Sequence, residues 1–220
     1  MAIYAFTIVA FLIPFSGMGI AQSLLRYGAK QTNQDSKRAM FSYCLRYGIL
    51  ASVVLAVLLF VFSETITYKL PESASYLKWF ALMLLSSFVF EMVKVQYRLE
   101  HNNKAFAIAD ITYSILLVVL MSVGAYFTGA LGYTLAFVLS PAIVGLFGLY
   151  KIGIFEYDGF KREKGFWLYG VFSSLGNVTT ELLIAIDILL IGNILLDNEL
   201  VTAYKYVTLI PFSLLFLSHV

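Results

Sequence analysis

This 220-residue sequence predicts an all-α membrane protein, a bundle of membrane-spanning helices. Hydrophobic residues make up 60% of the chain and charged residues only 13%, about half the charged share of an ordinary soluble domain. The apolar runs are continuous and about twenty residues long, the length that a helix needs to cross roughly 30 Å of hydrocarbon. A membrane barrel would show short alternating strands instead. Composition and run length therefore both favour helices.

Seven apolar segments follow one another along the chain, and each is long enough for one span. They are residues 2–25, 40–62, 76–93, 105–127, 130–150, 166–195 and 201–220. The first has no basic residues ahead of it and is too long for the core of a signal peptide, so we expect it to be retained. Pro14 permits a kink in it. Gly17 and Gly19 in this segment, like Gly145 and Gly148 in the fifth, fit close helix packing or local flexibility.

Positively charged residues gather in alternate connections between the segments. The connections after the first, third and fifth segments are basic, whereas those after the second, fourth and sixth are poor in bases. The basic residues are Arg26, Lys30, Lys37 and Arg38; Lys94, Arg98 and Lys104; and Lys151, Lys161, Arg162 and Lys164. Because short basic loops stay in the cytoplasm, we expect a multi-pass protein of the cytoplasmic (inner) cell membrane with its first residue outside.

The sixth segment carries a polar stripe. At 100° per residue its polar side chains fall within an arc of roughly 140°, with leucines on the opposite face. They are Ser173, Asn177, Thr180, Glu181 and Asp187. An ionised residue at the centre of a span costs roughly 2.5 to 3.5 kcal/mol on the insertion scale, so such residues face protein or a water-filled cavity. The stripe indicates either bonds to neighbouring helices or the wall of a polar cavity.

Other charged residues lie inside or near the segments. Arg46 is a few residues into the second segment from the basic side, where it can hold an anionic headgroup or pair with Asp110. Glu91 and Lys94 are three residues apart and are expected to form an interfacial pair. Lys78 lies close to the outer edge of the third segment, which favours a side chain that snorkels to the interface.

Several classes of function are not indicated by the sequence. The net charge of +2 is small and scattered, which argues against nucleic-acid binding. The chain has no HExxH, CxxC or GxSxG motif and no Gly-rich phosphate loop, and His101 and His219 are isolated. The single Cys44 cannot form an internal disulfide. We therefore expect no catalytic residues, no metal site and no cofactor.

Three stretches resemble a known family of membrane transporters. GMGIAQSLLRYGAK, residues 17–30, is similar to the end of the second helix in the polysaccharide-export branch of the multidrug/oligosaccharidyl-lipid/polysaccharide flippase superfamily. That family's connection between its fourth and fifth helices is similar to the stretch VQYRLEHNNKAFAIADI. Its passage from the seventh to the eighth helix is similar to the stretch ELLIAIDILLIGNILLDNELVTAYKYVTLIP. These proteins are the O-antigen and teichoic-acid repeat-unit transporters.

The resemblance implies an architecture of two lobes around a central cavity that opens alternately to either side. The seven segments would be the family's second to eighth helices out of twelve to fourteen, so the chain would be a fragment that does not transport by itself. Residues 1–150 would belong to the first lobe, 151–165 to a cytoplasmic connection between lobes, and 166–220 to the start of the second lobe. The outside start inferred from charge agrees with a missing first helix.

The same resemblance implies the roles of the candidate residues. A lipid-linked oligosaccharide of the polyprenyl diphosphate type brings a polar, anionic head through hydrocarbon while its tail stays in membrane lipid. Candidates for binding the anionic headgroup are Arg26, Arg46 and Lys205, and candidates for the cavity wall and for coupling to H⁺ or Na⁺ are Asn177, Thr180, Glu181 and Asp187. The two carboxylates are coupling candidates because a buried carboxylate can change its charge state.

Three alternatives stay open beside the flippase. A cation-coupled small-molecule antiporter has the same lobes and also needs a buried acid. A membrane enzyme of glycan assembly would need a clustered catalytic site near one surface, whereas every loop here is short. A seven-span receptor would use Lys205 as a Schiff-base residue, but Lys205 lies close to the outer edge and the third segment has no Asp at its centre.

Overall fold

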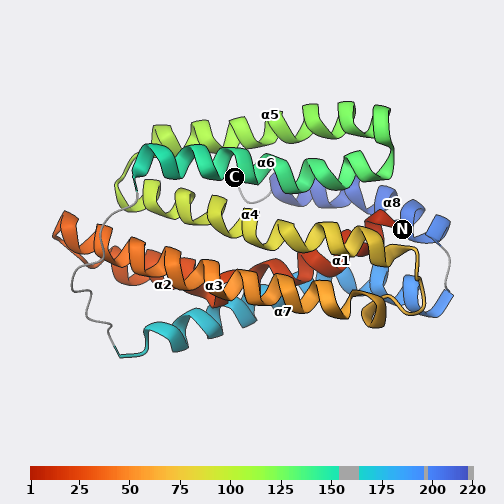
Figure 1. Cartoon of the computed structure of the whole chain (residues 1–220), viewed down its shortest axis with the longest axis horizontal. Helices are drawn as coiled ribbons and strands as arrows, with labels where there is room; N and C mark the ends of the chain where they lie inside the picture. Colours follow the sequence, from red (N-terminus) through yellow and green to blue (C-terminus); the bar gives the residue numbers. More distant parts are fainter. Residues whose placement is uncertain (154–163, 196–197, 218–220) are drawn as a thin grey trace.

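The computed structural model describes residues 1–153, 164–195 and 198–217, and these residues form helices and turns without any strand. The α-helices are α1 (Ala2–Leu12), α2 (Ile20–Gly28), α3 (Gln34–Ile66), α4 (Ser73–Leu99), α5 (Asn103–Thr128), α6 (Ala130–Ile152), α7 (Phe166–Leu190) and α8 (Asn198–Leu217) (Figure 1). A 3₁₀-like segment, η1 (Ile13–Gly19), joins α1 to α2, and a π-helical turn, η2 (Ile191–Leu195), extends α7. The expected all-α fold is confirmed.

Five stretches of the described chain are long and apolar enough to cross a membrane. They are Ala2–Gly28, Gln34–Ile66, Ser73–Leu99, Asn103–Thr128 and Ala130–Ile152. They indicate a membrane protein and coincide with the first five expected segments. The sixth and seventh segments form α7 and α8, which are not among the five, so a total of seven spans stays a prediction. Most of the connection expected over residues 151–165 lies outside the described residues.

The first segment is a broken helix. Between α1 and α2 the backbone leaves the helical region at Ser16 (ψ 127°) and then takes positive φ angles at Gly17, Met18 and Gly19 (68°, 51° and 69°). Left-handed φ values cost little only for glycine, which explains two of these three residues. We call residues 13–19 the break. The kink expected from Pro14 is thus a full interruption midway along the 27-residue span.

The helices of the first five segments extend beyond the apolar residues that predict them. α3 begins at Gln34, six residues before its apolar segment, where the Asn33 side chain accepts a hydrogen bond from the Asp35 backbone N–H at 2.9 Å. Its 33 residues span about 50 Å at 1.5 Å per residue, more than the hydrocarbon core. Apolar composition marks only the part of a helix that lies in lipid, whereas the helix itself continues until a cap or turn ends it.

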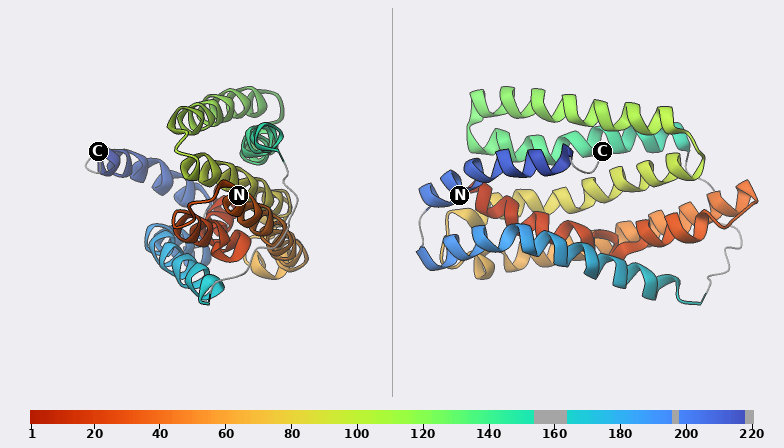
Figure 2. Two further views of the ribbon diagram at one scale, coloured as in Figure 1. Left: turned by 90° about the vertical axis from the view of Figure 1, so that its left-hand side faces the viewer. Right: turned by 180° about the vertical axis from the view of Figure 1, so that it is seen from behind.

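α4 lies at the centre of the bundle. It packs against α1 and α3 on one side and against the α5–α6 hairpin on the other (Figures 1 and 2). Phe88 of α4 is 2% exposed, and a Cβ atom added at Gly17 or at Gly48 would collide with its ring. On the other side a Cβ at Gly148 of α6 would meet Val93. Close packing at Gly17 and Gly148 is therefore confirmed.

α7 packs along the first, broken span. The Ser23 hydroxyl donates a 2.7 Å hydrogen bond to the carbonyl of Phe166, and the Trp167 indole N–H donates to the Tyr43 hydroxyl at 3.1 Å. These bonds tie the beginning of α7 to α2 and α3. Further along, a Cβ at Gly19 would collide with the carbonyl of Gly170, so α7 and the break are in backbone contact. α8 projects from the side of the bundle (Figure 2).

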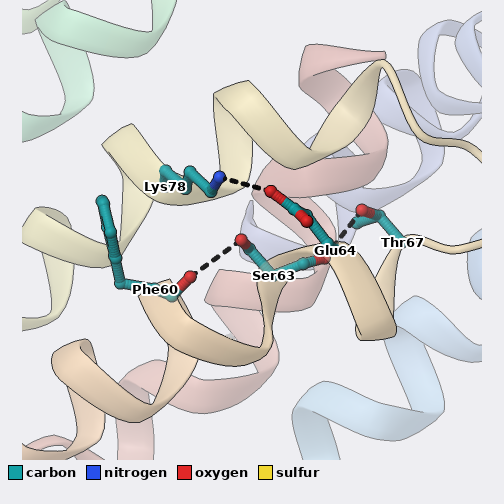
Figure 3. A network of polar contacts seen from close by, with 5 residues as sticks. All are labelled: Phe60, Ser63, Glu64, Thr67 and Lys78. Carbon is teal, nitrogen blue, oxygen red and sulfur yellow. Dashed lines mark hydrogen bonds and ion pairs between the residues drawn. The ribbon is translucent and has the colours of Figure 1, made fainter.

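The turns alternate between the two ends of the bundle. The α2–α3 turn, the α4–α5 turn and the end of α6 gather at one end, which we call the basic end because the basic connections lie there (Figure 1). At the opposite end the Lys78 ammonium donates to the Glu64 carboxylate at 2.8 Å and joins α4 to α3 (Figure 3). Lys78 is thus ion-paired at the edge of the bundle, close to where it was expected to snorkel.

Replacement of Gly19 by alanine should destabilise the fold by about 2 kcal/mol or more, since it combines a left-handed φ with a collision against the Gly170 backbone. The matched control is Gly176→Ala in α7, where an added Cβ has no neighbour within 4 Å and helix propensity should raise stability by up to about 1 kcal/mol. Unfolding in detergent micelles measures both changes. Equal stability of the two variants would show that the break is not held in this conformation.

Candidate functional site

A cleft of about 480 Å³ lies beside the break, between α4 and α7. Its lining residues come from six elements: Ile13, Pro14, Ser16 and Gly19 from the break; Ala21 and Gln22 from α2; Met83, Ser87, Phe88, Phe90, Glu91 and Lys94 from α4; Tyr113 from α5; Pro141 from α6; and Ser174, Asn177, Thr180 and Glu181 from α7. Hydrophilic groups of the expected spans thus converge on one hollow. The cleft is the candidate functional site.

The α7 wall contains three of the residues that the sequence proposes for the site. Asn177, Thr180 and Glu181 are spaced i, i+3 and i+4 and therefore share one helix face. Ser174 continues this face by one turn; it is 1% exposed, and its hydroxyl has no hydrogen-bond partner among the described residues. A buried hydroxyl without a partner costs about 1 to 3 kcal/mol. Water or a ligand in the cleft would supply the missing bond.

The α4 wall contains polar residues that were not predicted to belong to the site. Ser87, Glu91 and Lys94 are spaced i, i+4 and i+7 and lie on the same helix face. Residues at this spacing form a polar stripe like that of the sixth segment. The stripe is the sequence signal that could have identified these three residues as part of the site. Here the structure places Glu91 and Lys94 in the cleft, where only an interfacial pair was expected.

Lys94 of α4 forms an ion pair with Asp110 of α5. Its ammonium lies 3.0 Å from the Asp110 carboxylate, and the side chain of Lys94 is 21% exposed. The rings of Phe90 and Phe106 lie 5.2 and 5.4 Å from the same nitrogen, within the range of cation–π attraction. Asp110 thus bonds to Lys94, whereas the sequence offered Arg46 as its partner. Among the described residues that line the cleft, Lys94 is the only lysine or arginine, and the ion pair with Asp110 holds its side chain in place.

The break forms the third wall. An interrupted helix presents backbone N–H and C=O groups that have no partner within the helix, and at membrane depth such backbone is tolerated only where it is buried in protein or lines a water-filled cavity. Ser16 and Gly19 of the break line the cleft. The Ser16 hydroxyl donates to the Ile13 carbonyl at 2.6 Å and so satisfies one of these groups.

The remaining predicted residues lie outside the cleft lining. Arg26 is exposed near the end of α2, with its guanidinium carbon 4.2 Å from the centre of the Tyr169 ring. Arg46 is exposed on α3. Asp187 accepts a 2.7 Å hydrogen bond from the Tyr204 hydroxyl, which links α7 to α8, and Lys205 follows Tyr204 on α8. The structure therefore brings together Asn177, Thr180 and Glu181 but not these four.

Two carboxylates and one ammonium give the cleft its charge. Glu91, Glu181 and Lys94 line it, and Asp110 shares the ammonium of Lys94. Negative groups thus outnumber positive ones around the cavity. No group of three or more His, Cys, Asp or Glu side chains with metal-binding geometry occurs in the described part of the chain. The arrangement suits hydrogen bonding to a polar ligand and attraction of a cation.

Comparison with protein-family models, with curated proteins and with solved structures finds no match to this chain. The resemblance of residues 17–30 and of the two further stretches to the flippase family therefore remains a prediction.

A cysteine at position 177 should react with a water-soluble thiol reagent at least about tenfold faster than one at position 183, because the reactive thiolate forms only where water reaches. Asn177 lines the cleft, whereas Leu183 is 71% exposed on the apolar face of α7. The native Cys44 is fully buried and does not interfere. Labelling is measured in membranes, and labelling at position 177 as slow as that of a lipid-facing position would show that the cleft is dry.

Proposed function

We propose that this chain is part of a membrane transporter that flips lipid-linked oligosaccharide, a polysaccharide repeat unit, across the cytoplasmic membrane by alternating access. It is not an enzyme in this proposal. The observation that carries the proposal is the polar cleft beside a helix broken at membrane depth. Interrupted helices whose backbone lines a cavity near the middle of the bilayer are typical of transporters.

The cleft offers a saccharide the groups that it needs. Gln22, Ser87, Asn177 and Thr180 place amides and hydroxyls around one cavity, and a sugar exchanges its hydrogen bonds to water for bonds to such groups. The buried Ser174 hydroxyl adds a group without a hydrogen-bond partner in the described part of the chain. The polyprenyl tail needs no protein partner, because it stays in membrane lipid during transfer.

Lys94 is the new candidate for the anionic diphosphate. It is the lysine of the cleft, and a diphosphate that enters would compete with Asp110 for its ammonium. Arg26 and Arg46 are exposed on the helices α2 and α3, where an approaching headgroup can meet them first. Lys205 on α8 stays a third candidate for binding the anionic headgroup outside the cleft.

Glu181 is the stronger of the two candidates for coupling to H⁺ or Na⁺. It lines the cleft, so a change in its charge acts directly on whatever occupies that cavity. Asp187 instead accepts a hydrogen bond from Tyr204 outside the cleft lining. The break supplies a hinge for alternating access, since residues 16–19 already lie outside helical geometry and can change conformation without unwinding α1 or α2.

Replacement of Glu181 by glutamine should lower export of polysaccharide to the cell surface at least about tenfold, because an amide keeps the size of the side chain but cannot change its charge state. Complementation of cells that lack the native gene by the full-length protein carrying the substitution, with surface polysaccharide as the readout, measures this loss. The control Glu72→Gln removes an exposed carboxylate beside the α3–α4 turn and should leave export unchanged. Wild-type export by the Glu181 variant would contradict the proposed coupling.

A cation-coupled small-molecule antiporter is the second candidate, favoured by the excess of carboxylates in the cleft. Glu91 and Glu181 would attract a cationic substrate more readily than an anionic one. Export of a cationic dye from vesicles, driven by Na⁺ or H⁺, without any effect on surface polysaccharide, would favour the antiporter over the flippase. In that case Glu91→Gln and Glu181→Gln should each reduce dye export.

A further inference from the structure

A groove of about 370 Å³ lies between α5 and α6, separate from the cleft lining. Its two walls are the facing sides of α5 and α6, which run in opposite directions. Lys104, Ile108 and Thr112 follow one another at i, i+4 and i+8 on α5, and Lys151, Phe147 and Ile143 follow the same spacing in reverse on α6. Two lysines therefore lie at one end of the groove, the basic end, and apolar side chains continue from them along the hairpin.

Neither lysine is neutralised by a neighbour in the described part of the chain. The ion pairs found there are Lys78 with Glu64 and Lys94 with Asp110. Lys151 instead lies 4.8 Å from the centre of the Phe147 ring. Two ammonium groups that line one groove repel each other unless an anion lies between them. The charge of this end is complementary to a phosphate group.

The rest of the groove is complementary to a hydrocarbon chain. Ile108, Ile143 and Phe147 are 54%, 49% and 57% exposed, and they belong to helices that are long and apolar enough to cross a membrane. From Lys104 to Thr112 the groove runs about 12 Å at 1.5 Å per residue. A soluble phosphate would leave this apolar length unused, whereas one acyl chain of a phospholipid follows it.

We propose that this groove binds an anionic phospholipid from the leaflet at the basic end, with its phosphate between Lys104 and Lys151 and one acyl chain between Ile108 and Phe147. Basic pockets between membrane helices on the cytoplasmic side are suited to anionic headgroups. Basic loops face the cytoplasm, so the lipid belongs to the inner leaflet. The site is independent of the proposed function, since the groove and the cleft have no lining residue in common.

Titration of the purified chain with phosphatidylglycerol, followed by native mass spectrometry, tests the site. The double variant Lys104→Gln/Lys151→Gln should bind phosphatidylglycerol roughly tenfold more weakly, since each lysine near an anionic lipid contributes appreciably to its affinity. Binding of phosphatidylcholine with the same acyl chains should not change. The control Lys30→Gln/Lys164→Gln removes the same charge from the basic end outside the groove and should bind like the wild type.

A second variant tests the apolar half of the groove without a change of charge. Ala105 lines the groove beside Lys104, so Ala105→Leu narrows it and should also weaken phosphatidylglycerol binding. Three outcomes would overturn the proposal: equal affinity for phosphatidylglycerol and phosphatidylcholine, equal weakening by the control double variant, or displacement of the lipid by glycerol phosphate at similar concentration. The last would show a site for free phosphate.

Discussion

The packing of the break against α4 and α7 is the constraint on which the rest of the structure depends. Lipid offers no hydrogen bonds, so irregular backbone at membrane depth must be enclosed by protein or open to an aqueous cavity. Gly17 lies against the ring of Phe88 and Gly19 against the carbonyl of Gly170. The break is thus enclosed from two sides, and Ser16 and Gly19 also line the cleft. A side chain at either glycine would push a neighbouring helix away.

The cost of the charged groups in the bundle is lowered where they form an ion pair or face the cleft. A single ionised side chain in lipid is expensive, but charges of opposite sign offset part of that cost when they face each other or water. Lys94 and Asp110 form such a pair across α4 and α5. Glu91 and Glu181 belong to different helices yet line the same cavity. Polar residues that would each destabilise an isolated span are therefore tolerated together in the bundle.

The central and peripheral helices differ in what they contribute. α4 is buried along most of its length because helices cover it on both sides, whereas Ala109 is the one buried residue of α5. The outer faces of α5 and α6 are consequently exposed, and their two lysines, Lys104 and Lys151, line the groove at the basic end. α4 thus packs mainly against protein, whereas α5 and α6 keep large exposed apolar faces.

The sequence by itself determined the all-α class, the approximate position of the first five spans and the polar face of α7, because apolar run length and helical period are local properties. It could not determine that the first segment is interrupted rather than kinked, since the break packs closely against Phe88 of α4 and Gly170 of α7, which are distant in the sequence. It also could not decide which charges meet. The pairing of Lys94 with Asp110 depends on the distance and rotation between separate helices, and only tertiary packing fixes those.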